Sequence, residues 1–260
     1  MSVAVRCAFW QAIGAALILM LSHCICVGIV MYFDFSGKWE AYELSKSRSK
    51  SLSDRMYDYQ IGIRKFCLDL VLLFVPCIAF CFWCKGDKIA HSPDSMFLSF
   101  VKLLTGYALG KIWAFLVHYG LHFPLFYQFH RRHHRNPKNL VASAAWDDSF
   151  VEYAIMEIPS FAITLLLFPT HYYWHLIHFA WHGWDGACGH SGFAAPGLLG
   201  ACFNGEYHYH HHALLTVNYA ELEFLDKLCG THHSQRSVGV NKQTLSSTRS
   251  QQKTNNRILN

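Results

Sequence analysis

The sequence has little charge, and long stretches of it carry none. Only 15% of its 260 residues are Asp, Glu, Lys or Arg, whereas 52% are hydrophobic. The apolar residues occur in long runs and not in the amphipathic stripes of soluble helices. The net charge of +5 is too small and too scattered to indicate a nucleic-acid-binding protein. This balance is typical of a membrane protein with basic loops.

The chain also lacks the pattern of a disulfide framework, although it has ten cysteines. Cysteines within or beside apolar runs behave as small hydrophobic residues. Six have this setting, namely Cys24, Cys26, Cys67, Cys77, Cys81 and Cys84. Cys81 and Cys84 have the spacing of a redox or zinc pair, but no helix or strand context supports that role.

The first long apolar run covers residues 8–33 and has no charged residue. It exceeds the ~20 residues needed to cross a bilayer core. A signal peptide is the alternative, but the run is too long for its apolar region and no clear cleavage site follows. We therefore predict a retained transmembrane helix.

Two further spans are predicted at residues 66–84 and 97–117, the second interrupted by Lys102 and Lys111. Residues 151–182 are again apolar and long enough for a hairpin of two spans that turns near Phe168-Pro169-Thr170. One kinked or broken helix is the alternative. The predicted fold is all-α, an integral membrane helical bundle with four to five spans and a cytosolic histidine-rich cap.

Basic residues in short loops predict the orientation. The loop at 34–65 contains seven Lys or Arg, whereas the loop at 85–96 contains two. The first loop is therefore expected in the cytosol, and residues 118–150 with it. If residues 151–182 form a hairpin, the segment after residue 182 also lies on this side, and the histidine motifs described below then share one side of the membrane.

Three regions follow from these patterns. Residues 1–95 form an N-terminal transmembrane region, and residues 96–231 form a histidine-rich domain. Residues 232–260 form a polar tail, rich in Ser, Gln and Asn, which is expected to be disordered. The tail lacks a dilysine retrieval signal.

Histidine clustering is the strongest signal, because 16 of the 18 histidines lie between His118 and His233. Residues at i, i+3 and i+4 share a helix face, so side chains at these spacings can converge. Three groups have such spacings: "HYGLH" with His118 and His122, "HRRHH" with His130, His133 and His134, and "HYHHH" with His208, His211 and His212.

Several metal chemistries are excluded by missing motifs. The chain has no His-Glu-x-x-His, which a zinc protease needs, and no Glu-x-x-His of a bundle di-iron carboxylate site. Eight to ten imidazoles exceed what one tetrahedral zinc can use. Two sets of neutral ligands favour a pair of metals that accept six ligands, with iron as first choice.

A stripe of histidines also runs along the last apolar segment, at His171, His175, His178 and His182. Histidines within a membrane are costly and tend to be functional. We expect His182 to be a metal ligand, leave His178 open, and interpret His171 and His175 as bonding to water or neighbouring helices.

These motifs, together with "GHSGF" at 189–193 and "NYAELEFLDKLCGT" at 218–231, resemble the fatty acid hydroxylase/sterol desaturase superfamily, over roughly residues 98–231. The resemblance implies nine iron ligands, to which His182 is added from the membrane stripe. The predicted metal set is His118, His122, His130, His133, His134, His182, His190, His208, His211 and His212.

The resemblance also implies two non-haem iron ions, O2 as co-substrate, and hydroxylation, desaturation or oxidative demethylation of a lipid. A sterol and a fatty acyl or sphingoid chain both remain open, because Trp146, Asp147 and Asp148 stand where relatives often have His-Pro-x-Glu, and Ala220 replaces a glycine. The enzyme is accordingly C-4 methylsterol oxidase-like or fatty acid hydroxylase-like.

Ligand imidazoles need acceptors for their second nitrogen. Candidates near the motifs are Asp147, Asp148, Glu152, Asp185, Glu206 and Asp226. Beyond the metals, no catalytic residue is predicted.

The resemblance further implies a cytochrome-b5-type electron donor, and we expect an endoplasmic-reticulum membrane. The basic cluster of Arg131, Arg132, Arg135 and Lys138 suits either that donor or anionic headgroups. The alternative functions are a membrane metal-binding or metal-transport protein without redox catalysis, and a catalytically silent relative.

Overall fold

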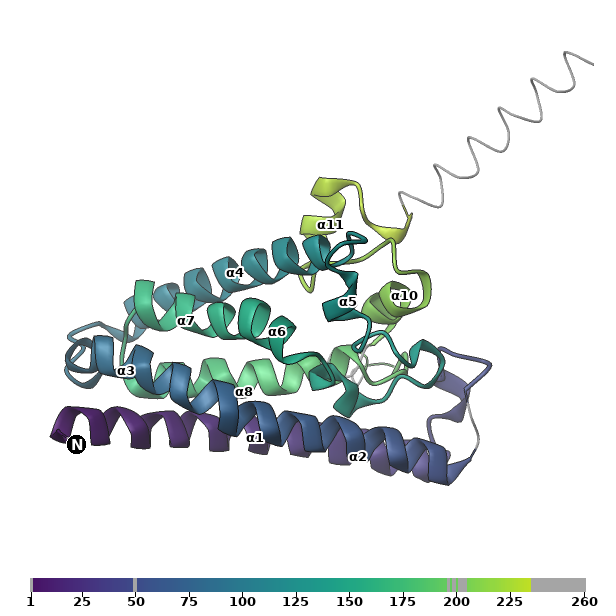
Figure 1. The fold of residues 1–260 in the computed structure, drawn as a ribbon, viewed down its shortest axis with the longest axis horizontal. Coiled ribbons are helices and arrows are strands. Elements are labelled where there is room, and N and C mark those ends of the chain that lie inside the picture. Colours follow the sequence, from purple (N-terminus) through teal and green to yellow (C-terminus); the bar gives the residue numbers. More distant parts are fainter. Residues whose placement is uncertain (1, 49–50, 196, 198–199, 201–204, 235–260) are drawn as a thin grey trace, which may run out of the picture.

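The computed structural model shows an α-helical bundle in which the long helices run side by side (Figure 1). It describes residues 2–48, 51–195, 197, 200 and 205–234, so the predicted tail lies, from residue 235, outside the described residues. The only β pairing within these described ranges is an isolated bridge between Glu43 and Phe193. The predicted all-α class is confirmed.

The first half of the chain forms two very long helices. α1 spans Val3–Phe35, and α2 (Leu52–Asp69) continues through a π-helical turn, η2 (Leu70–Phe74), into α3 (Val75–Ala90). The prediction of a loop up to residue 65 was wrong, because residues 52–65 are helical. At 1.5 Å per residue the 39-residue helix Leu52–Ala90 is about 58 Å long, roughly twice a bilayer core. Its polar first part therefore extends beyond the membrane, where hydropathy gives no signal.

The second half supplies α4 (Met96–Leu121) and a helical hairpin. Residues 151–182 belong to α6 (Phe150–Glu152), the π-helical η5 (Tyr153–Glu157), α7 (Ile158–Leu167) and α8 (Tyr172–Gly189). The break at residues 168–171 matches the hairpin interpretation and not a single kinked helix.

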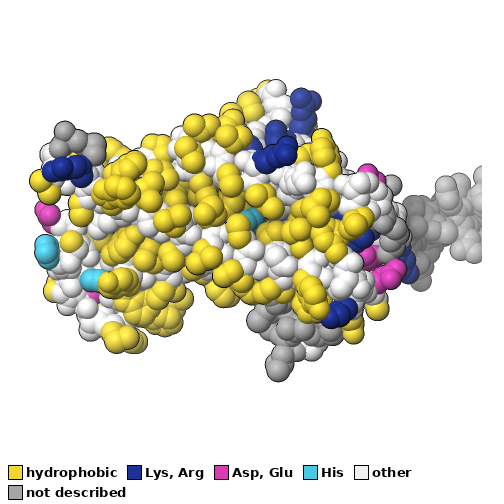
Figure 2. Space-filling model, turned by 90° about the horizontal axis from the view of Figure 1, so that it is seen from below, with side chains coloured by type: hydrophobic (Ala, Val, Ile, Leu, Met, Phe, Trp, Pro, Cys, Tyr) yellow, Lys and Arg dark blue, Asp and Glu magenta, His cyan; other side chains and the backbone are white. Residues whose placement is uncertain are grey.

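Within the described residues, four helices are long and apolar enough to cross a membrane: Val3–Phe35, Leu52–Ala90, Met96–Leu121 and Phe150–Leu167. Large apolar side chains on these helices face outward, and Figure 2 shows the largely apolar surface that they create on one face. A soluble protein does not expose such a surface. The protein is therefore an integral membrane protein.

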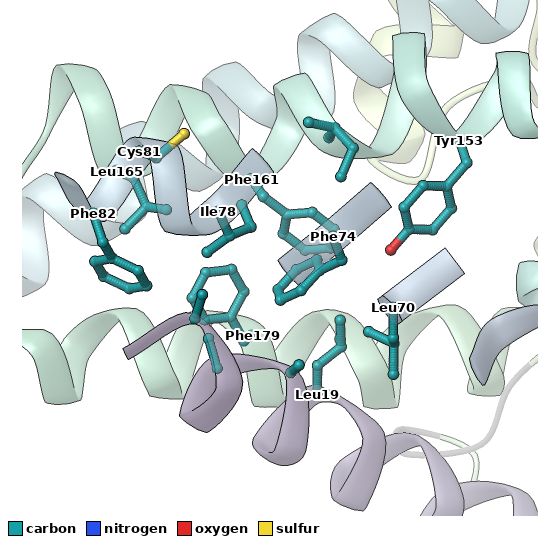
Figure 3. Packing of buried hydrophobic residues seen from close by; sticks show 14 of the residues in the cluster. Leu19, Leu70, Phe74, Ile78, Cys81, Phe82, Tyr153, Phe161, Leu165 and Phe179 are labelled. Carbon is teal, nitrogen blue, oxygen red and sulfur yellow. The ribbon is translucent and has the colours of Figure 1, made fainter. Parts of the chain in front are cut away.

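The bundle core lies between α1, α3, α7 and α8, as Figure 3 shows. Phe74 packs edge-on against Phe161 and Phe179, with ring centroids 5.3 and 5.4 Å apart. On α4, Gly110 lets the backbone approach α7 closely, because a Cβ there would lie 2.8 Å from the carbonyl oxygen of Ser160. Small residues allow this packing where helices meet inside a membrane.

Shorter segments gather at the end of the bundle where α4 and α8 finish (Figure 1). They include α5 (Tyr127–His130), α10 (Glu206–Leu214) and α11 (Glu223–Cys229), with the short 3-10 turns η1 (Glu40–Tyr42), η3 (Pro137–Asn139) and η4 (Ala142–Trp146) in the connecting loops. This arrangement brings the histidine motifs to one end of the bundle, as the hairpin interpretation requires.

Candidate metal centre

Nine of the ten predicted ligands meet at this end in two groups, and within each group the ligand atoms lie within 4.8 Å of one another. Seven of the nine side chains are buried, and His122 and His208 are partly buried. The first group is His118, His122, His130, His134 and His211, and the second is His133, His190, His208 and His212. His182 is in neither group.

The first group has its Nε2 atoms turned toward a common point. His130 Nε2 lies 3.0 Å from His118 Nε2 and 2.9 Å from His134 Nε2. His211 Nε2 lies 3.1 Å from His122 Nε2 and 3.2 Å from His134 Nε2. Five imidazoles from α4, the α5 region and α10 thus surround one site.

In the second group the Nε2 atoms likewise converge, here around His190, which directly follows α8. Its Nε2 lies 3.1 Å from that of His133, 3.0 Å from that of His208 and 3.1 Å from that of His212. His208 and His212, one helical turn apart on α10, are 3.0 Å apart at Nε2.

Each His-x-x-His-His motif serves both groups, which corrects the expectation that each motif aims at one point. His208 and His212 join one group, and His211 joins the other. At 100° per residue, positions i and i+4 lie about 40° apart on a helix, whereas i+3 and i+4 lie about 100° apart. His130 and His134 share a group in the same way, although α5 ends at His130 and a turn carries the rest of that motif.

Backbone carbonyl groups hold several of these imidazoles. His118 Nδ1 donates to the carbonyl oxygen of Tyr219 at 2.7 Å, and His190 Nδ1 donates to that of Gly186 at 2.9 Å. His211 Nδ1 likewise donates to the carbonyl oxygen of residue 217, at 2.7 Å. A carbonyl only accepts, so the proton is on Nδ1 and the Nε2 lone pair faces the group.

A carboxylate does the same for His130, whose Nδ1 lies 2.6 Å from Glu152 Oε1. The Nε2 lone pairs of His118 and His130 therefore face each other across 3.0 Å. Two lone pairs at this distance repel unless a cation lies between them.

A proton does not fill this role, because burial and neighbouring imidazoles lower the pKa of His130 well below its usual value. In the second group the same causes lower the pKa of His133, and burial lowers that of His190 to about 4. The imidazoles are thus neutral at neutral pH, which is the form that binds metal. Metal–nitrogen bonds of about 2.1 Å put adjacent octahedral ligands about 3.0 Å apart and tetrahedral ones about 3.4 Å apart. The shortest separations, 2.9–3.2 Å, lie near the octahedral edge, and the five imidazoles of the first group exceed the four of tetrahedral zinc, so the donor set is compatible with a six-coordinate metal such as iron.

Residues 103–231 match the model of the fatty acid hydroxylase family. Through this domain the chain belongs to the fatty acid hydroxylase/sterol desaturase superfamily. Comparison with curated proteins and with solved structures gives no match. The family consists of membrane lipid-modifying oxidases that depend on iron, and all nine clustered histidines lie within the matched residues.

Of the acidic residues predicted to orient ligands, Glu152 contacts an imidazole of the two histidine groups directly. Four others pair with groups outside these two sets: Asp147 with Arg132 and Arg135, Asp148 with Lys65, Asp185 with Lys111, and Glu206 with His210. Two arginines of the predicted basic cluster, Arg132 and Arg135, thus already form ion pairs with Asp147.

Asp226 acts on the centre through the backbone. It accepts hydrogen bonds from the amide groups of Tyr219 at 3.0 Å and Ala220 at 2.7 Å, and from the Tyr207 hydroxyl at 2.6 Å. These contacts fix the loop that carries two of the orienting carbonyl groups. Sequence reasoning missed these carbonyl groups, since every residue has one and no side-chain signal marks them.

A cavity of about 60 Å³ connects the fatty acid hydroxylase centre with the membrane part of the bundle. His118, His130, His133, His190 and His208 form its metal-facing wall. Its other walls include Lys111, Phe115, Trp146, Glu157, His182 and Glu221. A second cavity, of about 250 Å³, shares His190 and His208 and is lined by Trp181, Trp184 and Tyr207.

Proposed function

We propose that the protein is an O2-dependent membrane oxidoreductase that hydroxylates, desaturates or oxidatively demethylates a lipid at a histidine-ligated di-iron centre. The observation that carries the proposal is the pair of buried groups whose Nε2 lone pairs converge at 2.9–3.2 Å within a fatty acid hydroxylase domain. Both a C-4 methylsterol oxidase-like and a fatty acid hydroxylase-like reaction fit this centre.

In this proposal the five-histidine group holds one iron ion and the four-histidine group holds the second. When bound, the two ions supply the reductive activation of O2 that allows an unactivated C–H bond to be broken. Glu152 and the carbonyl groups of Tyr219 and Gly186 keep the Nδ1 protons in place, so that Nε2 stays available.

The rest of the chain positions the lipid and excludes water. Apolar and aromatic side chains such as Phe115 and Trp146 form part of the wall of the cavity at the centre, beside Lys111, Glu157 and Glu221. Side chains from the last turns of α4 and α8 line it, so in this proposal a lipid reaches it from the bilayer without crossing bulk water.

We assign the histidine-bearing end to the cytosol and the membrane to the endoplasmic reticulum, with a cytochrome-b5-type or similar donor. The basic loop before α2 supports this orientation. Arg131, which is exposed at the same end, would contact an acidic donor or anionic headgroups.

Metal content and lipid analysis test the proposal together. The purified chain is expected to hold about two irons per chain after anaerobic reconstitution. Lipids of cells that lack the protein should regain an oxidised product with the wild-type chain or His91→Ala, and not with a His130→Ala/His133→Ala double variant. Tight zinc without O2-dependent lipid oxidation would instead support the metal-binding or transport alternative.

A further inference from the structure

One face of α8 leads from the membrane core to the metal centre. His178, His182, Gly186 and His190 follow at steps of four residues, so they share this face. His190 belongs to the second histidine group, and Gly186 supplies the carbonyl that orients it. His182 lines the same 60 Å³ cavity from its membrane side.

The side chain of His182 is 5% exposed, and its Nε2 has no hydrogen-bond partner among the described residues. His178 lies one turn farther into the membrane, and neither of its ring nitrogens has a hydrogen-bond partner among the described residues. The rings around His182 are those of His178, Phe161 and Tyr107, with centroids 4.6, 4.8 and 5.5 Å away. A buried polar nitrogen without a partner is costly, so the cavity is where its partner binds.

The charges around the cavity restrict the chemistry of that partner. The ammonium group of Lys111 is already paired with Asp185, at 3.2 Å, and with Glu221. Glu157 lines the cavity as well, so the side chains other than the proposed metal ligands bring two carboxylates, Glu157 and Glu221, and one ammonium group. They offer no free cation for a lipid carboxylate or phosphate, whereas a neutral hydroxyl can both donate and accept.

We propose that His182 forms a hydrogen bond with a hydroxyl group of the lipid substrate and so determines which carbon meets the metal centre. This inference rests on the proposed function and deepens it: the substrate is a lipid alcohol, not a free fatty acid. Eight helical residues separate His182 from His190, a rise of about 12 Å. The oxidised carbon therefore lies on the order of 10 Å from the hydroxyl group, so of the two reactions proposed above this inference excludes the C-4 methylsterol oxidase-like one, which attacks a methyl group beside the ring hydroxyl.

Binding of matched lipid pairs to the full chain in nanodiscs tests this inference without catalysis. The probes are radiolabelled cholesterol with its 3-methyl ether, and hexadecan-1-ol with 1-methoxyhexadecane and hexadecanoic acid, each corrected for uptake by empty discs. The two alcohols distinguish a ring hydroxyl from a straight-chain one. Measurements on metal-free and iron-loaded protein separate binding from oxidation.

We expect one alcohol to bind roughly tenfold more tightly than its ether, and the acid to bind weakly. His182→Phe should abolish this preference, His182→Gln should keep part of it, and the exposed control His91→Phe should keep all of it. Loss of packing alone would weaken alcohol and ether equally, so the ratio reports the hydrogen bond.

An unchanged alcohol-to-ether ratio in His182→Phe overturns the inference, as does preferred binding of the acid. Loss of iron from both His182→Phe and His182→Gln also overturns it, because His182 would then be a ligand. If the ratio depends on His182 but no lipid is oxidised at any iron content, the inference holds and the proposed oxidase function fails.

Discussion

Glu152 and His130 contact each other at the histidine centre, with the carboxylate oxygen 2.6 Å from Nδ1 and both side chains fully buried. The contact joins the start of the α6–α7 segment to the "HRRHH" motif. Because the carboxylate accepts a hydrogen bond from the Nδ1–H group, the Nε2 lone pair of His130 is directed at His118 and His134.

Removal of this carboxylate should weaken metal binding without removing a ligand. For Glu152→Ala we expect a loss of about 10–100-fold in iron affinity, the range typical for groups that orient metal-bound histidines. Glu152→Gln, which keeps an acceptor oxygen, should lose less. Competition with a chromophoric chelator measures this, with the exposed Glu206→Gln as control. Equal affinity in Glu152→Ala and wild type would contradict the orienting role.

The neighbours His210 and His211 offer a matched test of the ligand assignment. His211 faces the five-histidine group, whereas His210 stacks on His233 with ring centroids 4.5 Å apart. His211→Ala should lower the iron content and abolish lipid oxidation, because it removes one metal ligand from the five-histidine group. His210→Ala should keep both. Elemental analysis of the two purified variants measures their iron content. Equal iron loss in both would contradict the assignment of His211 as a ligand.

The histidine centre could be predicted from the sequence because its ligands are side chains at recognisable spacings. The division of each motif between two groups could not, since spacing alone does not say where the partners of a helix lie. His211 and His212 are adjacent in sequence, yet they point to different groups.

The surroundings of the centre were harder to predict for the same physical reason. Asp147 and Asp148 are near the "HRRHH" motif in sequence, but their carboxylates turn to Arg132 and Lys65 instead of the imidazoles. Nearness along the chain does not determine the side from which a side chain leaves the backbone. The carbonyl group of Tyr219 orients His118 and carries no sequence signal at all.

Acidification should destabilise the metal-free protein. Burial lowers the pKa of His190 to about 4, so the unfolded chain takes up this proton near pH 6.5 and the folded chain does not. The free energy of unfolding therefore decreases as pH falls from about 6.5 toward 4, and this contribution stops changing below that. Denaturation in detergent over this pH range measures the slope. His190→Gln should reduce the slope, while a slope unaffected by His190→Gln would contradict the burial effect.

Close packing of α4 on α7 should make Gly110 sensitive to a single methyl group. A Cβ at Gly110 would lie 2.8 Å from the carbonyl oxygen of Ser160, which is backbone and cannot rotate away. Gly110→Ala should therefore lower the free energy of unfolding by about 1–3 kcal/mol, despite the better helix propensity of alanine. Gly28→Ala in α1 is the matched control, because a Cβ there meets no described atom within 4 Å. Denaturant titration of both variants in the same detergent measures the difference. If Gly110→Ala were as stable as Gly28→Ala, α4 and α7 would lie farther apart than the structure shows, and the cavity between them and the histidine centre would be wider.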